Sequence, residues 1–70
     1  MSRSEQQHYT KDDLKVMTVP EWAQSNSLSL FTAKAIIARG EGPPVIQLSK
    51  RRIGIRVIDN ARWQEQRIRD

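Results

Sequence analysis

The most constraining feature of this 70-residue chain is that it contains no cysteine. The hydrophobic core of a domain this small contributes only about 3–5 kcal/mol, and small proteins often add disulfides or a structural metal. The sequence allows neither, because its single histidine, His8, stands alone in a polar stretch. We therefore expect one small domain that holds no metal and no other cofactor and that relies on its own core or on a partner.

No part of the sequence is apolar for long enough to cross a membrane. The longest apolar run, Ala35–Ala38, has four residues, whereas a helical span needs about 20. The N-terminal segment MSRSEQQHYTKDDLK also lacks the apolar region of a secretory signal. We expect a cytoplasmic protein without a membrane partner.

The charges are distributed unevenly along the chain. Residues 1–33 carry three basic and four acidic side chains, whereas residues 34–70 carry nine basic and four acidic ones, a net charge of +5. The isoelectric point is about 10.1. A basic half of this kind is typical of proteins that bind a polyanion.

Residues 1–15 are polar and show no apolar periodicity, so we expect a flexible arm there and a folded domain over 16–70. Thr18 and Glu21 have the spacing of a capping box, in which each side chain accepts a hydrogen bond from the other residue's amide. Pro20 suits the first turn, where a backbone N–H has no partner within the helix. The pattern predicts a short helix that begins after Thr18.

A second helix is predicted over Leu30–Arg39. Ser29 can cap its start, and Gly40 suits a left-handed stop behind it. Three apolar residues recur at helical spacing and mark the buried face: Ala33, Ile36 and Ile37. The polar residues 25–27 leave only a short turn between the two helices, so the pair is typical of a helix-turn-helix unit.

The periodicity changes from helix to strand after residue 44. Two β-rich runs, 45–48 and 53–57, flank a short turn with three cations, which predicts a two-stranded hairpin. Ile53, Ile55 and Val57 should pack on the helix pair, which leaves the basic tip in solvent as a wing.

A third helix is predicted from Ile58 to about Arg67, with Asp59 in its first turn, where a negative charge is favourable. The expected fold is therefore α+β: a small winged helix-turn-helix with three helices and a two-stranded hairpin.

This order of elements, from Met17 to Arg67, resembles the excisionase and AlpA-like winged-helix DNA-binding proteins, whose domain is similar to the DNA-binding part of MerR regulators. The residues that carry the resemblance are Thr18–Ala23, Ser29, Thr32, Arg39–Pro44, Lys50–Ile53, Ile55, Asp59 and Trp63. The most specific of them is the run from Arg39 to Pro44 followed by the basic hairpin.

The sequence departs from the family pattern in two places. The family usually has two leucines near Ser25 and Asn26, followed by a turn glycine where this chain has Ser27. It also tends to have polar or basic residues at the positions of Leu30 and Phe31. Either Phe31 folds back into the vacant core volume, or it stays outside and contacts a ligand.

A winged helix-turn-helix would contact DNA through its second helix and its wing. Cations near phosphates give affinity, and side chains at base edges give specificity. Lys34 suits either a phosphate or a guanine acceptor, and a basic tip suits a narrow minor groove. The predicted recognition-helix residues are Ser29, Phe31, Thr32, Lys34, Ala35 and Arg39. The predicted wing residues are Ser49, Lys50, Arg51 and Arg52.

The residues also bear on the class of function. The chain has one histidine and no cysteine, from which a nucleophile–base pair cannot be built, so we expect a protein that is not an enzyme. One helix and one wing cover about 10 bp, so several copies would have to bind cooperatively on double-stranded DNA.

The resemblance implies a DNA-bending accessory factor, an excisionase or recombination directionality factor, whose partner is a site-specific integrase that excises a mobile element. The alternatives are an AlpA-like transcriptional regulator and, from another class, a protein-interaction module built on Leu30, Phe31 and Trp22.

Overall fold

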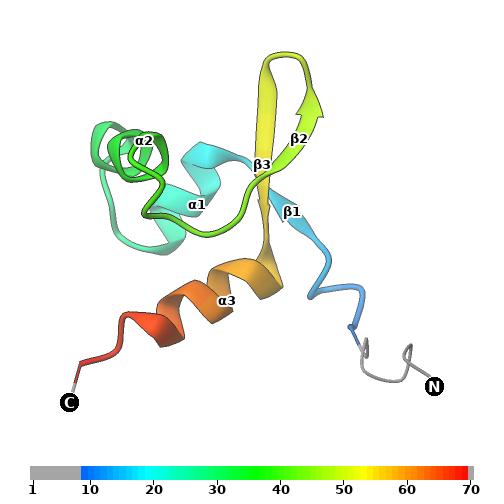
Figure 1. Ribbon diagram of the computed structural model, residues 1–70. Helices are drawn as coiled ribbons and strands as arrows, with labels where there is room; N and C mark the ends of the chain where they lie inside the picture. Colours follow the sequence, from blue (N-terminus) through cyan, green and yellow to red (C-terminus); the bar gives the residue numbers. More distant parts are fainter. Residues whose placement is uncertain (1–8, 70) are drawn as a thin grey trace.

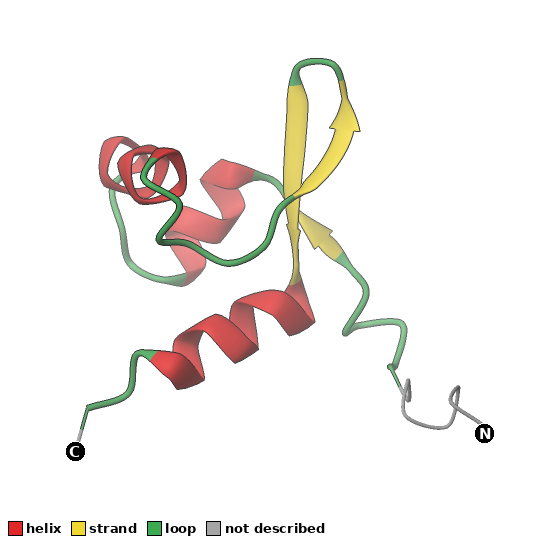
Figure 2. Cartoon of the chain, in the orientation of Figure 1, coloured by secondary structure: helices red, strands yellow, loops and turns green. Residues whose placement is uncertain are grey.

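The computed structural model describes residues 9–69 (Figure 1). Its elements in chain order are β1 (Val16–Met17), α1 (Val19–Ser25), α2 (Leu30–Ala38), β2 (Ile46–Ser49), β3 (Arg52–Arg56) and α3 (Val57–Gln66). Three helices and a three-stranded antiparallel sheet form a small α+β domain. The hairpin of β2 and β3 rises away from the three helices (Figure 2).

The sheet has one strand more than the sequence predicted. The strand order is β1-β3-β2, with Met17 opposite Ile55 and Ile46 opposite Gly54. The predicted hairpin of β2 and β3 is present, but the sequence did not predict β1, whose two residues are too few to show an alternating pattern. Gly54 is needed where the strands meet, since a Cβ at this position would collide with the side chain of Val16.

The local signals for α1 and α2 are confirmed. The Thr18 side chain accepts a hydrogen bond from the Glu21 amide at 3.2 Å, and the Glu21 carboxylate accepts one from the Thr18 amide at 2.8 Å. Ser29 Oγ accepts a hydrogen bond from the Thr32 amide at 3.1 Å. The chain leaves α2 through Gly40, whose φ of 72° lies in the left-handed region that favours glycine.

The core lies between the two N-terminal helices and β3. Its buried apolar residues are Trp22, Ala23, Ala33, Ile36 and Ile55. The ring of Trp63 from α3 meets Trp22 edge-on, with centroids 5.2 Å apart, and extends this core. Of the predicted buried face of α2, Ile37 is only half-buried.

The sequence predicts that Ile53, Ile55 and Val57 face the helices, and this is correct in part. Ile55 is fully buried and Ile53 is half-buried. Val57 does not belong to the strand, because it is the first residue of α3. Its amide donates to the carbonyl of Lys15 at 2.9 Å, which continues the register of β1 with β3 up to the first residue of the helix.

The start of α3 is held by the segment that precedes β1. The Ile58 amide donates to the carbonyl of Asp13 at 2.9 Å, so α3 begins without a side-chain cap. Thr10 and Asp13 bond each other's amides at 3.0 Å and so shape this segment. Of the predicted arm over 1–15, residues 1–8 lie outside the described residues, and residues 9–15 carry these contacts.

Polar side chains form a hydrogen-bond network in the turn between α1 and α2. Asn26 Nδ2 donates to the Trp22 carbonyl at 2.9 Å and to Asn60 Oδ1 at 3.1 Å. Gln64 donates to Asn26 Oδ1 at 2.7 Å, and Trp22 Nε1 donates to Asn60 Oδ1 at 2.8 Å. Ser27 occupies the expected glycine position with a φ of 57°. The turn is therefore bonded to α3.

Candidate nucleic-acid interface

The outward face of α2 is open to solvent. Phe31 is 83% exposed, so it stays outside the core, and Lys34 is exposed one turn further on. Ala35 is half-buried and Ala38 is exposed, so only small side chains follow Lys34 along this face. A helix with small residues on its outer side can approach another surface closely.

The other predicted residues of this region lie at the two ends of α2. Ser29 and Thr32 are exposed at its start, where their hydroxyls lie 2.9 Å apart. Arg39 lies at the far end, and its Nε forms an ion pair with Glu41 Oε1 at 3.1 Å. Arg39 is thus partly neutralised, whereas Lys34 has no ion pair within residues 9–69.

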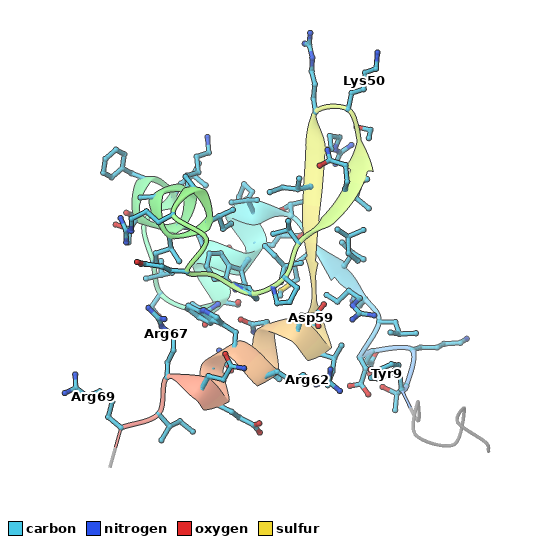
Figure 3. The ribbon with its side chains drawn as sticks, in the orientation of Figure 1. Tyr9, Lys50, Asp59, Arg62, Arg67 and Arg69 are labelled. Carbon is cyan, nitrogen blue, oxygen red and sulfur yellow. The ribbon has the colours of Figure 1, made fainter. Side chains whose placement is uncertain are left out.

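The hairpin tip concentrates positive charge away from the body of the domain. Ser49, Lys50, Arg51 and Arg52 are all exposed, and Lys50 stands at the far end of the hairpin (Figure 3). The ion pairs within the described residues are Arg39–Glu41 and Arg56–Asp59, so no tip cation takes part in one. The Gln47 side chain donates to the carbonyls of Ser49 and Arg52 and so closes the turn.

An open groove of about 510 Å³ connects the hairpin to the helix pair. The residues that line it are Thr18, Val19, Pro20, Lys34, Arg51, Arg52 and Ile53. The fold therefore brings Lys34 together with two tip cations that are 17 and 18 positions away in the sequence. It does not bring Phe31 or Arg39 into this groove.

Sequence reasoning missed the wall of the groove formed by Thr18, Val19 and Pro20. These residues were interpreted as the start of a helix, and they have that role as well. Nothing in their local pattern indicates that the hairpin folds over them. Only the pairing of β3 with β1, which directly precedes α1, places them there.

Three further arginines, Arg56, Arg62 and Arg67, differ from those of the hairpin in having partners. Arg56 donates to both oxygens of the buried Asp59, at 2.7 and 3.2 Å, and this hydrogen bonding raises the pKa of Arg56. The guanidinium of Arg67 lies 4.8 Å from the centre of the Trp63 ring, and that of Arg62 lies 5.7 Å from the Tyr9 ring. Arg62 in α3 and Arg67 directly after it lie at the opposite end of the molecule from Lys50 (Figure 3).

The described residues contain neither a candidate metal site nor a helix that could span a membrane. Residues 9–69 contain no cluster of three His, Cys, Asp or Glu side chains that could hold a metal ion. None of the helices within these residues combines the length and the apolar character needed to cross a bilayer. No match to this chain was found among protein-family models, curated proteins or solved structures.

Proposed function

We propose that this protein binds double-stranded DNA, with α2 in the major groove and the β2–β3 hairpin on the adjacent backbone, as a small winged helix-turn-helix domain. The observation that carries the proposal is the open groove in which Lys34, Arg51 and Arg52 meet without an acidic partner within the described residues. Clustered like charges repel each other, and an anion relieves that repulsion. The DNA backbone presents closely spaced phosphates to such a cluster.

The shape of the interface suits a duplex. The major groove is wide enough for an α-helix, and the small Ala35 and Ala38 allow α2 to lie deep in it. Arginines of the hairpin then reach the phosphates or the narrow minor groove beside it, where recognition depends on DNA shape more than on base identity. Lys34, between the two, reaches a phosphate or a guanine edge.

Within DNA binding, we propose an accessory factor that bends DNA and promotes integrase-mediated excision of a mobile element in the cytoplasm. The resemblance of Met17–Arg67 to excisionases supports this role. One such domain covers about 10 bp, so several copies would act together on neighbouring sites. An AlpA-like transcriptional regulator would use the same interface. An excision assay with a cognate integrase, run beside a promoter reporter, separates the two roles.

Salt dependence tests the class of function. If Lys34, Arg51, Arg52 and two further cations meet phosphates, the logarithm of the binding constant falls with the logarithm of salt concentration at a slope of about −4 to −5. The double variant Arg51→Ala/Arg52→Ala should weaken the slope by about 2 and reduce affinity about 30-fold on every sequence. A flat salt response of the wild type would overturn the proposal.

A charge-matched control separates the hairpin from the overall positive field. The double variant Arg62→Ala/Arg69→Ala removes the same charge from the α3 side, where both residues are exposed. It should bind duplex DNA within about twofold of the wild type at physiological salt, because Arg62 and Arg69 lie at the opposite end of the molecule from Lys50 (Figure 3) and salt screens exposed charges over a Debye length of about 8 Å. Equal losses in the two double variants would discard the hairpin as a contact.

Lys34→Ala separates base recognition from backbone contact. Loss of a guanine contact should change the preferred sequence, whereas loss of a phosphate contact lowers affinity uniformly. Competition between duplexes of different sequence distinguishes the two outcomes.

The protein-interaction alternative loses one of its three residues in the structure. Trp22 is fully buried, so it contributes nothing to a surface patch. Leu30, at 42% exposed, and Phe31 remain.

A further inference from the structure

We propose that Phe31 recognises the 5-methyl group of thymine in the major groove, so that α2 selects its sites by apolar contact. This inference rests on the proposed function. Its first basis is exposure: Phe31, at 83%, is the most exposed large apolar side chain within residues 9–69. Single exposed apolar residues are common on surfaces, so the neighbours of Phe31 decide what it can contact.

The neighbours of Phe31 leave few ways to recognise a base. Lys34 and Ala35 follow it at i+3 and i+4 and therefore share its face of the helix, and Ala38 continues that face. Of these four residues, only Lys34 has a side chain that donates hydrogen bonds. The base edges in the major groove carry hydrogen-bonding groups and one apolar group, the thymine methyl. A face of one phenylalanine and two alanines matches that methyl and no other feature of the edges.

Charge complementarity favours DNA over a protein as the occupant of this face. The ring belongs to the helix that also carries Lys34, and Lys34 lines the groove with Arg51 and Arg52. Any surface that covers Phe31 therefore also approaches Lys34, and Lys34, Arg51 and Arg52 have no ion pair within residues 9–69. An apolar protein surface would leave these charges without a counterion, whereas a duplex supplies phosphates on both sides of the groove that receives the ring.

The test exchanges thymine for uracil, because the two bases differ only in the methyl group. Duplexes enriched from a random pool by the full chain are synthesised again with uracil in place of thymine, and both forms are titrated. The wild type should lose about fourfold in affinity for each methyl that it contacts. Phe31→Ala should bind the thymine duplex more weakly and should lose most of the sensitivity to uracil. The slope against salt should stay the same throughout, since no charge changes.

The controls keep the possible failures separate. Ile68→Ala removes another exposed apolar side chain, 71% exposed beyond the end of α3, and should keep the full response to uracil. Phe31→Leu should retain part of that response, because an apolar side chain remains. Equal wild-type affinity for both duplexes overturns the inference and leaves DNA binding intact.

Two further outcomes also overturn the inference. If Phe31→Ala leaves duplex binding unchanged but lowers self-association in sedimentation, Phe31 contacts a second copy of the chain. If the wild type shows no salt-dependent binding to any duplex, the proposed function fails and the recognition of thymine fails with it.

Discussion

Two short polar connections of this molecule have opposite roles. In the turn between α1 and α2, Asn26 forms hydrogen bonds with the Trp22 carbonyl, Asn60 and Gln64. In the hairpin tip, residues 50–52, three cations have no ion pair within the described residues. The difference lies in what faces each connection, since α3 supplies amides to the turn, whereas no element within residues 9–69 covers the tip. Polar residues in a connection therefore stabilise the fold in one case and remain available to a ligand in the other.

The strongest test of this contrast removes the residue to which the turn is bonded. Trp22→Ala deletes a fully buried side chain, its edge-on contact with Trp63 and its hydrogen bond to Asn60. The expected loss is about 4 kcal/mol, close to the whole stability of a domain this small. Circular dichroism should show a largely unfolded chain at 25 °C. The control is Phe31→Ala, which removes an exposed aromatic side chain and should unfold within about 2 °C of the wild type. If Trp22→Ala instead unfolds cooperatively at the same temperature as the wild type, the assignment of the core is wrong.

The second prediction concerns the acceptor that serves both Trp22 and Asn26. Asn60→Ala leaves the Trp22 Nε1 group buried without its partner and removes one hydrogen bond of the turn. We expect a loss of about 2 kcal/mol, which lowers the melting temperature by about 10 °C in a domain of this length. Gln24→Ala, on the exposed side of α1, is the matched control and should change little. A melting temperature that stays within 2 °C of the wild type would show that the turn does not depend on α3.

The features that the sequence predicted are those that depend on neighbours within four residues. The capping box of Thr18 and Glu21, the cap at Ser29 and the left-handed Gly40 are each confirmed, because a hydrogen bond or a steric limit within one turn determines them. The hairpin of β2 and β3 was predicted for the same reason, since a short loop joins its strands. Exposure of Lys34 and of the tip follows directly from these elements.

The features that the sequence missed depend on distant residues. β1 exists only because Val16 and Met17 pair with residues of β3 that lie 40 and 38 positions further along the chain. The alternative that placed Trp22 in an exposed patch is wrong, because Trp63 and Asn60 of α3 cover this residue. The amide network of the turn likewise requires α3 opposite it. The site was predicted as two separate segments, and the groove that joins them comes from the strand pairing.

The third prediction has a smaller effect, on the backbone of the turn. Ser27 has a φ of 57°, a conformation that disfavours residues with a Cβ. Ser27→Gly removes this penalty but loses more backbone entropy on folding, so we expect a net stabilisation of about 0.5 kcal/mol. Ser25→Gly, at the last residue of α1, should instead destabilise the protein, because it adds backbone entropy to the unfolded chain and removes the hydroxyl that donates to the Trp22 carbonyl. Thermal melts of both variants decide the matter, and destabilisation by Ser27→Gly would mean that its hydroxyl has a role in the turn.

The smallest expected effect is on the stability of the protein when the tip is neutralised. Replacing Lys50, Arg51 and Arg52 by alanine removes repulsion among charges that stabilise nothing within the described fold, so we expect a gain of about 0.3 kcal/mol at low salt. The gain should vanish at 1 M salt, where the Debye length is about 3 Å. If the triple variant melts several degrees below the wild type, the tip stabilises the fold as the turn does. Its cations would then be bonded to the fold and unavailable to phosphates.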